Sequence, residues 1–212
     1  MSSRFDIGVR YILPIYPFLL VLASRLATFR PPPLVAVLMA IAIAWNAANV
    51  IRLAPHFLAA GNAIAGGPIG LARCLSDSNV DWGQALGELK RYMDRERVPA
   101  LYLSYFGTAR PSDYGIRYQY IPSFSGEDPG QVLSPSDKPI LAISVTNLHG
   151  VYLADHDLYG WLRAKTPIAT VGYAIYVYDL SDDPEAHCRL AGAYGRYNEW
   201  RYQAIERARC GR

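Results

Sequence analysis

The sequence predicts a membrane protein with two N-terminal transmembrane helices, followed by a soluble α/β domain with a mainly parallel sheet. Three observations predict this class. Hydrophobic residues make up 51% of the chain, more than in a typical soluble domain. Residues 31–51 form a run of 21 without a charged side chain. After position 76, segments with helical periodicity alternate with short apolar segments typical of strands.

Charges are distributed as unevenly as apolar residues. Of the 18 acidic residues only Asp6 precedes position 76, whereas six arginines do. Residues 1–75 therefore carry a formal charge of +5 and residues 76–212 one of −2. Arginines beside apolar segments are typical of membrane proteins, and no basic stripe marks the remainder as a nucleic-acid-binding surface. We expect membrane lipid as a partner and no nucleic acid.

The second apolar segment, residues 33–52, is predicted to be a transmembrane helix. A bilayer core of about 30 Å requires roughly 20 helical residues, which this segment supplies. Prolines precede it, where proline is tolerated at a helix start. Trp45 lies toward its far end, as suits a residue type enriched at membrane interfaces.

The first apolar segment, residues 7–29, is predicted to be the other transmembrane helix. It includes Arg10 and Arg25, whose long side chains reach the interface from positions near helix ends. The alternative is a cleaved signal peptide with its cleavage site at 21–23. Two prolines inside the apolar region and a second span soon after it favour the helix.

The link between the spans, residues 24–33, carries two arginines and no acid, so the positive-inside rule makes it cytoplasmic. The chain is then a multi-pass protein of the inner (plasma) membrane, and its soluble part is extracytoplasmic. The expected organisation is two transmembrane helices within residues 1–55, a connector over 56–75, an extracytoplasmic α/β domain over 76–182 and a polar helical tail over 183–212.

Within the soluble part, local patterns predict individual elements. Leu86, Leu89 and Met93 fall on one side of an amphipathic helix over 86–97. The other expected elements are strands over 100–106 and 140–146, a helix within 151–165, a strand-rich segment over 168–180 bent at Gly172, and a polar helix over 194–209.

The cysteines and the sequence motifs limit the kinds of site that the chain can contain. Cys74, Cys188 and Cys210 include no C-x-x-C, so a zinc site has no support. A Cys188–Cys210 disulfide is possible in an oxidising compartment, but three unpaired thiols are the preferred interpretation. Residues 149–157 hold metal-ligating residue types without a helical His-x-x-x-His spacing, and are interpreted as a loop. Phosphate-loop and serine-nucleophile motifs are absent, and we expect no metal or cofactor.

Candidate binding residues follow position 80. Carboxylates and amides hydrogen-bond sugar hydroxyls and an indole stacks on sugar faces, so Asp81, Trp82 and Gln84 are candidate substrate-binding residues. In the alternative, Asp81 caps the next helix and Trp82 belongs to the core. Tyr105 follows a strand at a sheet edge where ligands bind. Tyrosines between 92 and 120 either line a carbohydrate groove or only pack.

Two further candidates lie near the start of the first span. Arg10 is placed at the outer end of the predicted helix, where a guanidinium can pair bidentately with a lipid phosphate. Tyr11 adjoins it. The alternative for both residues is an interfacial anchor that sets the depth of the helix.

Five stretches, taken in order and spacing, resemble the C-terminal region of bacterial multi-spanning glycosyltransferases of the GT-C type, relatives of the protein O-mannosyltransferase and aminoarabinose-transferase group. The resemblance covers roughly residues 5–180. The stretches are GVRYILPIYPFL at 8–19, DSNVDWGQ at 77–84, YLSYFGTA at 102–109, LAISVT at 141–146 and VGYAIYVYD at 171–179.

The resemblance implies transfer of a sugar from a polyprenyl-phosphate donor to an extracytoplasmic acceptor. The catalytic carboxylate of such enzymes lies in their first extracytoplasmic loop, and no residue here matches it. We therefore expect the C-terminal portion of a glycosyltransferase, a fragment without catalytic residues of its own that packs against missing N-terminal helices. The alternative is a free-standing, membrane-anchored extracytoplasmic binding domain without enzymatic activity.

Overall fold

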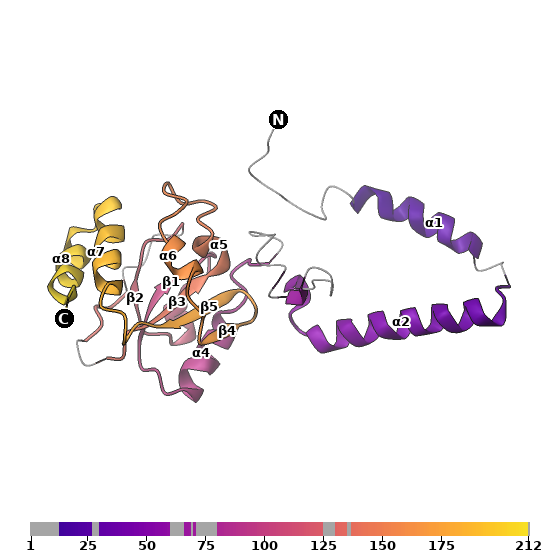
Figure 1. Ribbon diagram of the computed structural model, residues 1–212, viewed down its shortest axis with the longest axis horizontal. Coiled ribbons are helices and arrows are strands. Elements are labelled where there is room, and N and C mark those ends of the chain that lie inside the picture. Colours follow the sequence, from indigo (N-terminus) through magenta and orange to yellow (C-terminus); the bar gives the residue numbers. More distant parts are fainter. Residues whose placement is uncertain are drawn as a thin grey trace. The chain divides into compact units, whose positions relative to one another are not determined.

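The computed structural model divides into two compact units, Met1–Leu75 (unit 1) and Ser76–Arg212 (unit 2) (Figure 1). It describes residues 13–26, 30–59, 66–68, 70, 80–124, 130–134 and 137–211.

Unit 1 contains one long apolar helix, α2 (Pro33–Leu53), close to the predicted bounds. Its mean hydropathy reaches 2.1, and in the part of the chain that the structure describes it is the one helix long and apolar enough to cross a membrane. The helix begins at Pro33 because proline fits the first turn, where its missing N–H has no helical partner. None of its residues is buried.

The other helix of unit 1, α1 (Tyr16–Leu26), follows a 3₁₀ turn at Leu13–Ile15 and has 11 residues. At about 1.5 Å per residue this helix is shorter than a bilayer core. Pro17 occupies its first turn, where proline is tolerated. The remaining residues of the predicted span, 7–12 and 27–29, lie outside the described residues.

Unit 2 is built on a five-stranded sheet in the order β2-β1-β3-β5-β4 (Figure 1). β1 runs parallel to β2 and β3, whereas β5 runs antiparallel to β3 and β4. The sheet is therefore mixed rather than mainly parallel. The strands are β1 (Leu101–Ser104), β2 (Tyr118–Tyr120), β3 (Ile140–Ser144), β4 (Ala169–Val171) and β5 (Ile175–Asp179).

The antiparallel part of the sheet arises from a hairpin in the predicted strand-rich segment. Gly172 and Tyr173 both have positive φ angles, 55° and 56°, between β4 and β5. They are the two central residues of a tight turn closed by a hydrogen bond from the Ala174 N–H to the Val171 carbonyl oxygen over 3.1 Å, within a three-residue loop, and positive φ at both positions matches the twist of a hairpin. Gly172 is thus part of a chain reversal, and the reversal forces β4 and β5 to be antiparallel.

Helices cover both faces of the sheet and bury a core on each. On one face lies α4 (Leu86–Arg95), which buries Leu86, Leu89 and Met93 as predicted. On the other face lie α7 (Ala186–Arg196) and α8 (Trp200–Arg209), with two short helices, α5 (Val145–Leu148) and α6 (Gly160–Arg163), completing the unit.

Two predicted helices differ from the structure. The helix expected within 151–165 is confined to the four residues of α6, since the preceding residues form turns. The single polar helix expected over 194–209 is a pair, α7 and α8, separated near Asn198, whose φ of 60° is incompatible with a continuous helix.

A disulfide between Cys188 and Cys210 joins α7 to the end of α8, with 4.8 Å between the Cα atoms. The preferred interpretation of three unpaired thiols is therefore wrong for these two, and Cys74 lies outside the described residues. Closing a loop with a sequence separation of 22 residues stabilises a fold by about 3 kcal/mol in the chain-entropy treatment. Disulfides form and persist in oxidising compartments.

Candidate functional site

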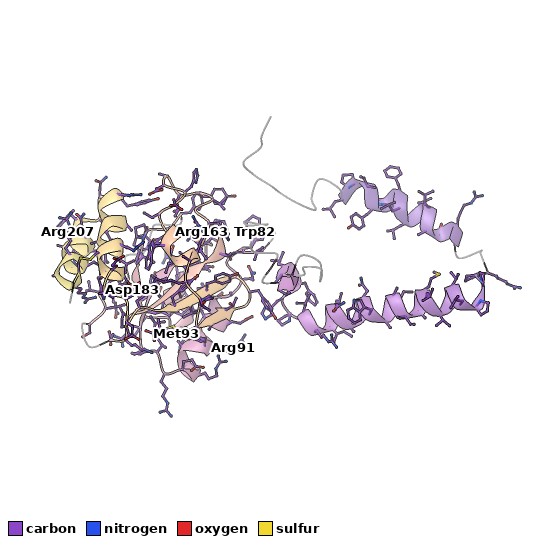
Figure 2. All side chains as sticks on the ribbon, viewed as in Figure 1. Trp82, Arg91, Met93, Arg163, Asp183 and Arg207 are labelled. Carbon is purple, nitrogen blue, oxygen red and sulfur yellow. A yellow bond between two sulfur atoms is a disulfide. The ribbon has the colours of Figure 1, made fainter. Side chains whose placement is uncertain are left out.

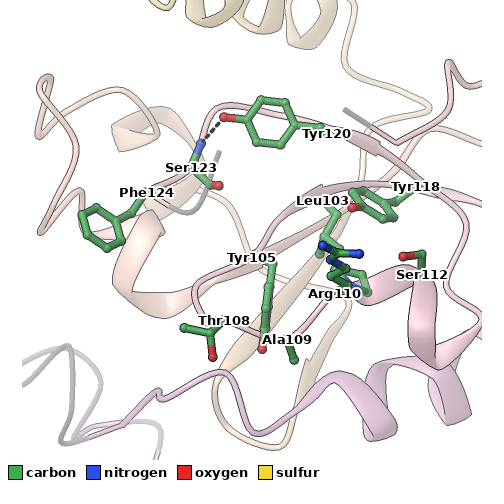
Figure 3. Close-up of a pocket in the computed structure, with 12 residues that line it drawn as sticks. Leu103, Tyr105, Thr108, Ala109, Arg110, Ser112, Tyr118, Tyr120, Ser123 and Phe124 are labelled. Atoms are coloured by element: carbon green, nitrogen blue, oxygen red, sulfur yellow. Dashed lines mark hydrogen bonds between the residues drawn. The ribbon is translucent and has the colours of Figure 1, made fainter. Parts of the chain in front are cut away.

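A pocket of about 790 Å³ opens near the carboxyl ends of β1 and β2. Leu103, Tyr118 and Tyr120 place it on the same face of the sheet as α4, since they share a core with that helix. Figure 3 shows Phe124 at one end and Arg110 with Ser112 at the other. The lining residues are Leu103, Tyr105, Gly107, Thr108, Ala109, Arg110, Pro111, Ser112, Tyr118, Tyr120, Ser123 and Phe124.

The wall of the pocket combines four aromatic rings, three of them tyrosines, with three serine or threonine hydroxyls and one guanidinium. Arg110 is exposed, and its guanidinium forms no hydrogen bond or ion pair with other described residues, although its backbone carbonyl oxygen accepts from the Asp113 N–H. No aspartate or glutamate is among the lining residues that the structure describes. Such a wall can stack on flat apolar faces, bond hydroxyl groups and pair with one anionic group.

Tyr120 and Ser123 show how the far wall is held. The Ser123 backbone N–H donates to the Tyr120 hydroxyl oxygen over 3.0 Å (Figure 3). Burial raises the pKa of Tyr120, so this phenol stays protonated at neutral pH. This hydrogen bond fixes the Tyr120 ring at the end of β2, because it joins the Tyr120 hydroxyl to the backbone three residues later.

The structure brings together two segments that the sequence marked separately. The Tyr105 hydroxyl donates to the Gly83 carbonyl oxygen over 2.7 Å, joining the turn after position 80 to the end of β1. Burial raises the pKa of Tyr105, and the Asp81 carboxylate raises it further, so the phenol remains a donor. Of the candidate substrate-binding residues Asp81, Trp82, Gln84 and Tyr105, only Tyr105 is among the described residues that line the pocket.

Asp81 and Gln84 form the turn itself. Asp81 is fully buried and its Oδ1 accepts from the Gly83 N–H over 2.9 Å. Gln84 accepts from the Trp82 N–H over 2.7 Å and donates to the Val80 carbonyl over 3.1 Å. The capping alternative for Asp81 is wrong, because α4 has Ala85 at its N-cap and no side-chain cap.

Trp82 points outward from this turn. Its side chain is 53% exposed, so the alternative that placed it in the core is wrong. It projects from the surface of unit 2 (Figure 2). It does not line the pocket, and Arg10 and Tyr11 lie outside the described residues.

The loop with metal-ligating residue types serves local structure. His156 Nδ1 lies 2.6 Å from the Gly150 carbonyl oxygen, Asp157 pairs with Arg163, and the Asp155 carboxylate meets Arg196 of α7. These contacts hold the turns between β3 and α6.

Sequence reasoning missed a polar cluster beneath the other face of the sheet, centred on the fully buried Glu206 of α8. Its Oε1 accepts from Tyr102 over 3.1 Å and from Gln119 over 3.0 Å, and Arg209 lies 3.4 Å away. His187 Nδ1 lies 2.6 Å from the other oxygen. Four separate elements supply these residues, so no local sequence signal could have found the cluster.

Some of the tyrosines named from the sequence line the pocket. Among the tyrosines considered as a carbohydrate groove, Tyr105, Tyr118 and Tyr120 line it. The i, i+2 spacing of Tyr118 and Tyr120 already places them on one face of a strand. Arg110 and Phe124 were missed, because each belongs to an irregular segment whose position depends on how the strands pair.

Known proteins give no further guide to this site. No family model matches the chain, and searches of curated proteins and of solved structures find no match either.

Proposed function

We propose that this chain is the C-terminal portion of a membrane glycosyltransferase that uses a polyprenyl-phosphate-linked sugar, and that its pocket binds the sugar-phosphate head of that donor. The observation that carries the proposal is the composition of the pocket wall. Aromatic rings, hydroxyls and Arg110, whose guanidinium has no partner among the described residues, line a volume of about 790 Å³. Ligand-binding clefts commonly have this size and this mixture of apolar walls and few polar groups.

Each part of the wall has a role in this proposal. The rings of Tyr118, Tyr120 and Phe124 offer faces for the apolar side of a sugar ring. Thr108 and Ser112 offer hydroxyls for the sugar hydroxyls. Arg110 presents a planar fork of N–H donors that matches two phosphate oxygens.

The proposed membrane arrangement has two spans, residues 7–29 and α2, with unit 2 outside the plasma membrane. The Cys188–Cys210 disulfide supports an oxidising compartment for unit 2. The two arginines in residues 24–33 support a cytoplasmic link. Arg10 and Tyr11 then contact membrane lipid at the outer interface, and further transmembrane helices supply the catalytic carboxylate.

A second candidate, a membrane-anchored binding domain without enzymatic activity, is favoured by one feature of the same pocket. Its described lining contains no carboxylate to act as a general base. Both candidates bind carbohydrate here, and they differ in whether sugar transfer occurs when further helices are joined.

Replacing Arg110 by alanine is expected to weaken donor binding about ten- to a hundredfold. A hydrogen bond to a charged group contributes about 1.5–3 kcal/mol, and about 1.4 kcal/mol corresponds to a factor of ten. The measurement uses the full chain in lipid nanodiscs and a fluorescent polyprenyl-phosphate hexose, with the dissociation constant as the readout.

Arg201→Ala is the matched control, because Arg201 is an exposed arginine of α8, a helix on the opposite face of the sheet. It should bind like the unaltered chain. Equal affinities for Arg110→Ala and the unaltered chain, with both folded, would show that the donor phosphate does not bind in this pocket.

A further inference from the structure

Two large apolar side chains of unit 2 are exposed near the pocket. Trp82 is 53% and Phe124 is 57% exposed (Figures 2 and 3). Phe124 belongs to the pocket wall, and Trp82 directly precedes the glycine bonded by the pocket residue Tyr105. Exposed apolar residues that gather in one region mark a contact surface more often than single scattered ones do.

A series of packed residues places the chain at Trp82 and the Phe124 side chain on the same side of the sheet, just after the carboxyl end of β1. Gly83 lies so close to the next segment that a Cβ there would be 2.7 Å from the Phe106 carbonyl oxygen. On its other side, the Phe106 ring lies 6.0 Å from that of Phe124 and is stacked on Tyr152 at 5.6 Å. Trp82, Phe106, Phe124 and Tyr152 are called the aromatic edge below.

The aromatic edge has a rigid support. Phe106 is buried, and its backbone N–H donates to the Ser144 hydroxyl oxygen at the end of β3 over 3.0 Å. Ser104, at the end of β1, receives a hydrogen bond from Asn147 of α5 over 3.1 Å. The chain that carries Phe106, on which Phe124 and Tyr152 pack, is therefore held by hydrogen bonds to the end of β3 and to α5.

The position of the aromatic edge along the chain indicates which kind of surface it contacts. The described part of unit 2 begins at Val80, two residues before Trp82, and 26 residues separate Val80 from the end of the apolar helix α2. The aromatic edge therefore belongs to a unit that is connected along the chain to the segment proposed to cross the bilayer. Tryptophan is enriched at the bilayer–water interface, where its ring contacts both headgroups and acyl chains.

We propose that the aromatic edge docks unit 2 on the surface of the bilayer, with Trp82 and Phe124 inserted at the level of the headgroups. The neighbouring pocket then opens at the membrane surface, where the head of a lipid-linked ligand lies. The described pocket lining carries Arg110 and no carboxylate, so it adds no repulsion toward lipid phosphates. This docking does not depend on which ligand the pocket takes.

Quenching of tryptophan fluorescence by lipids brominated near the top of their acyl chains tests the docking. The full chain is reconstituted in nanodiscs as a Trp45→Phe variant, because Trp45 lies in α2 and would itself be quenched. Brominated lipid should lower its emission relative to ordinary lipid. Adding Trp82→Phe should remove most of this difference, because the emission that responds to lipid comes from Trp82.

Trp200→Phe in the same background is the matched control. Trp200 is 76% exposed and begins α8, whereas the aromatic edge lies at the end of β1, so the lipid-dependent quenching should persist in this variant. All three altered tryptophans are exposed, which keeps the buried core intact. Quenching that survives Trp82→Phe, or none in the Trp45→Phe variant, would overturn the docking; the second outcome would point to a protein partner.

Discussion

Replacing Gly83 by alanine is expected to lower the free energy of unfolding of unit 2 by about 3 kcal/mol. Gly83 has a φ of 75°, a region that costs a non-glycine residue of order 1–3 kcal/mol. The added Cβ would also lie 2.7 Å from the Phe106 carbonyl oxygen and 2.9 Å from the Gly107 Cα. Both are backbone atoms of the segment that directly follows β1, and relieving the overlap requires a backbone shift, which adds about 1–3 kcal/mol. Urea unfolding of the full chain, followed by circular dichroism, measures the loss.

Gly192 of α7 provides the matched control for this substitution. No atom lies within 4 Å of the position that its Cβ would take, and its backbone is helical. Alanine favours a helix over glycine by up to about 1 kcal/mol, so Gly192→Ala should be neutral or stabilising. A Gly83→Ala variant as stable as the unaltered chain would contradict the close packing of the two segments at Tyr105.

Replacing Glu206 by alanine is expected to destabilise unit 2 by about 4 kcal/mol. The carboxylate is fully buried, and Tyr102, Gln119, His187 and Arg209 all direct polar groups at it. Its removal leaves the partly buried guanidinium of Arg209 without its counter-charge and the other polar groups without an acceptor, which typically costs about 3–5 kcal/mol. The same urea unfolding experiment measures the change.

Glu185→Ala is the comparison for Glu206→Ala. Glu185 pairs with Arg189 one helical turn away over 2.7 Å, but its side chain is 70% exposed. Exposed pairs of this spacing contribute no more than about 0.5 kcal/mol, so the loss should be small. Similar losses for the two substitutions would mean that the buried cluster does not stabilise the packing of α8 on the sheet.

Elements that depend on local pattern were predicted well. The apolar helix α2 was found within a residue or two at each end, because length and hydropathy alone define it. The buried side of α4 was also correct, since Leu86, Leu89 and Met93 recur at helical spacing. Neither prediction requires knowledge of what the element packs against.

Features that depend on distant partners were not predicted. Strand β5 runs antiparallel to β4 because the chain reverses at Gly172–Tyr173, which lacks the common Asn-Gly signal, and its antiparallel pairing with the distant β3 has no local signal at all. The disulfide requires α7 and α8 to fold back on each other, so that Cys188 and Cys210 meet. A continuous polar helix, as predicted, would have kept these two cysteines apart.

The candidate site shows the same division. Tyr105 was predicted as a binding residue because residues at the ends of strands commonly contact ligands, and it lines the pocket. The turn before α4 was noticed for its residue types, yet Asp81 and Gln84 bond mainly to the backbone around them. Arg110 gains its place in the pocket from the loop between β1 and β2, whose path follows from strand pairing rather than from local pattern.

Transfer of labelled sugar tests the central claim most directly. Membranes containing a labelled polyprenyl-phosphate hexose are supplied with this chain alone, or with the chain joined to the coding sequence immediately upstream of Met1. We predict transfer only in the joined form, and less of it with Arg110→Ala. Transfer by these 212 residues alone would contradict the account and direct the search for a catalytic carboxylate to Asp6, Asp77 and Asp81. Absence of transfer in both forms would contradict it as well.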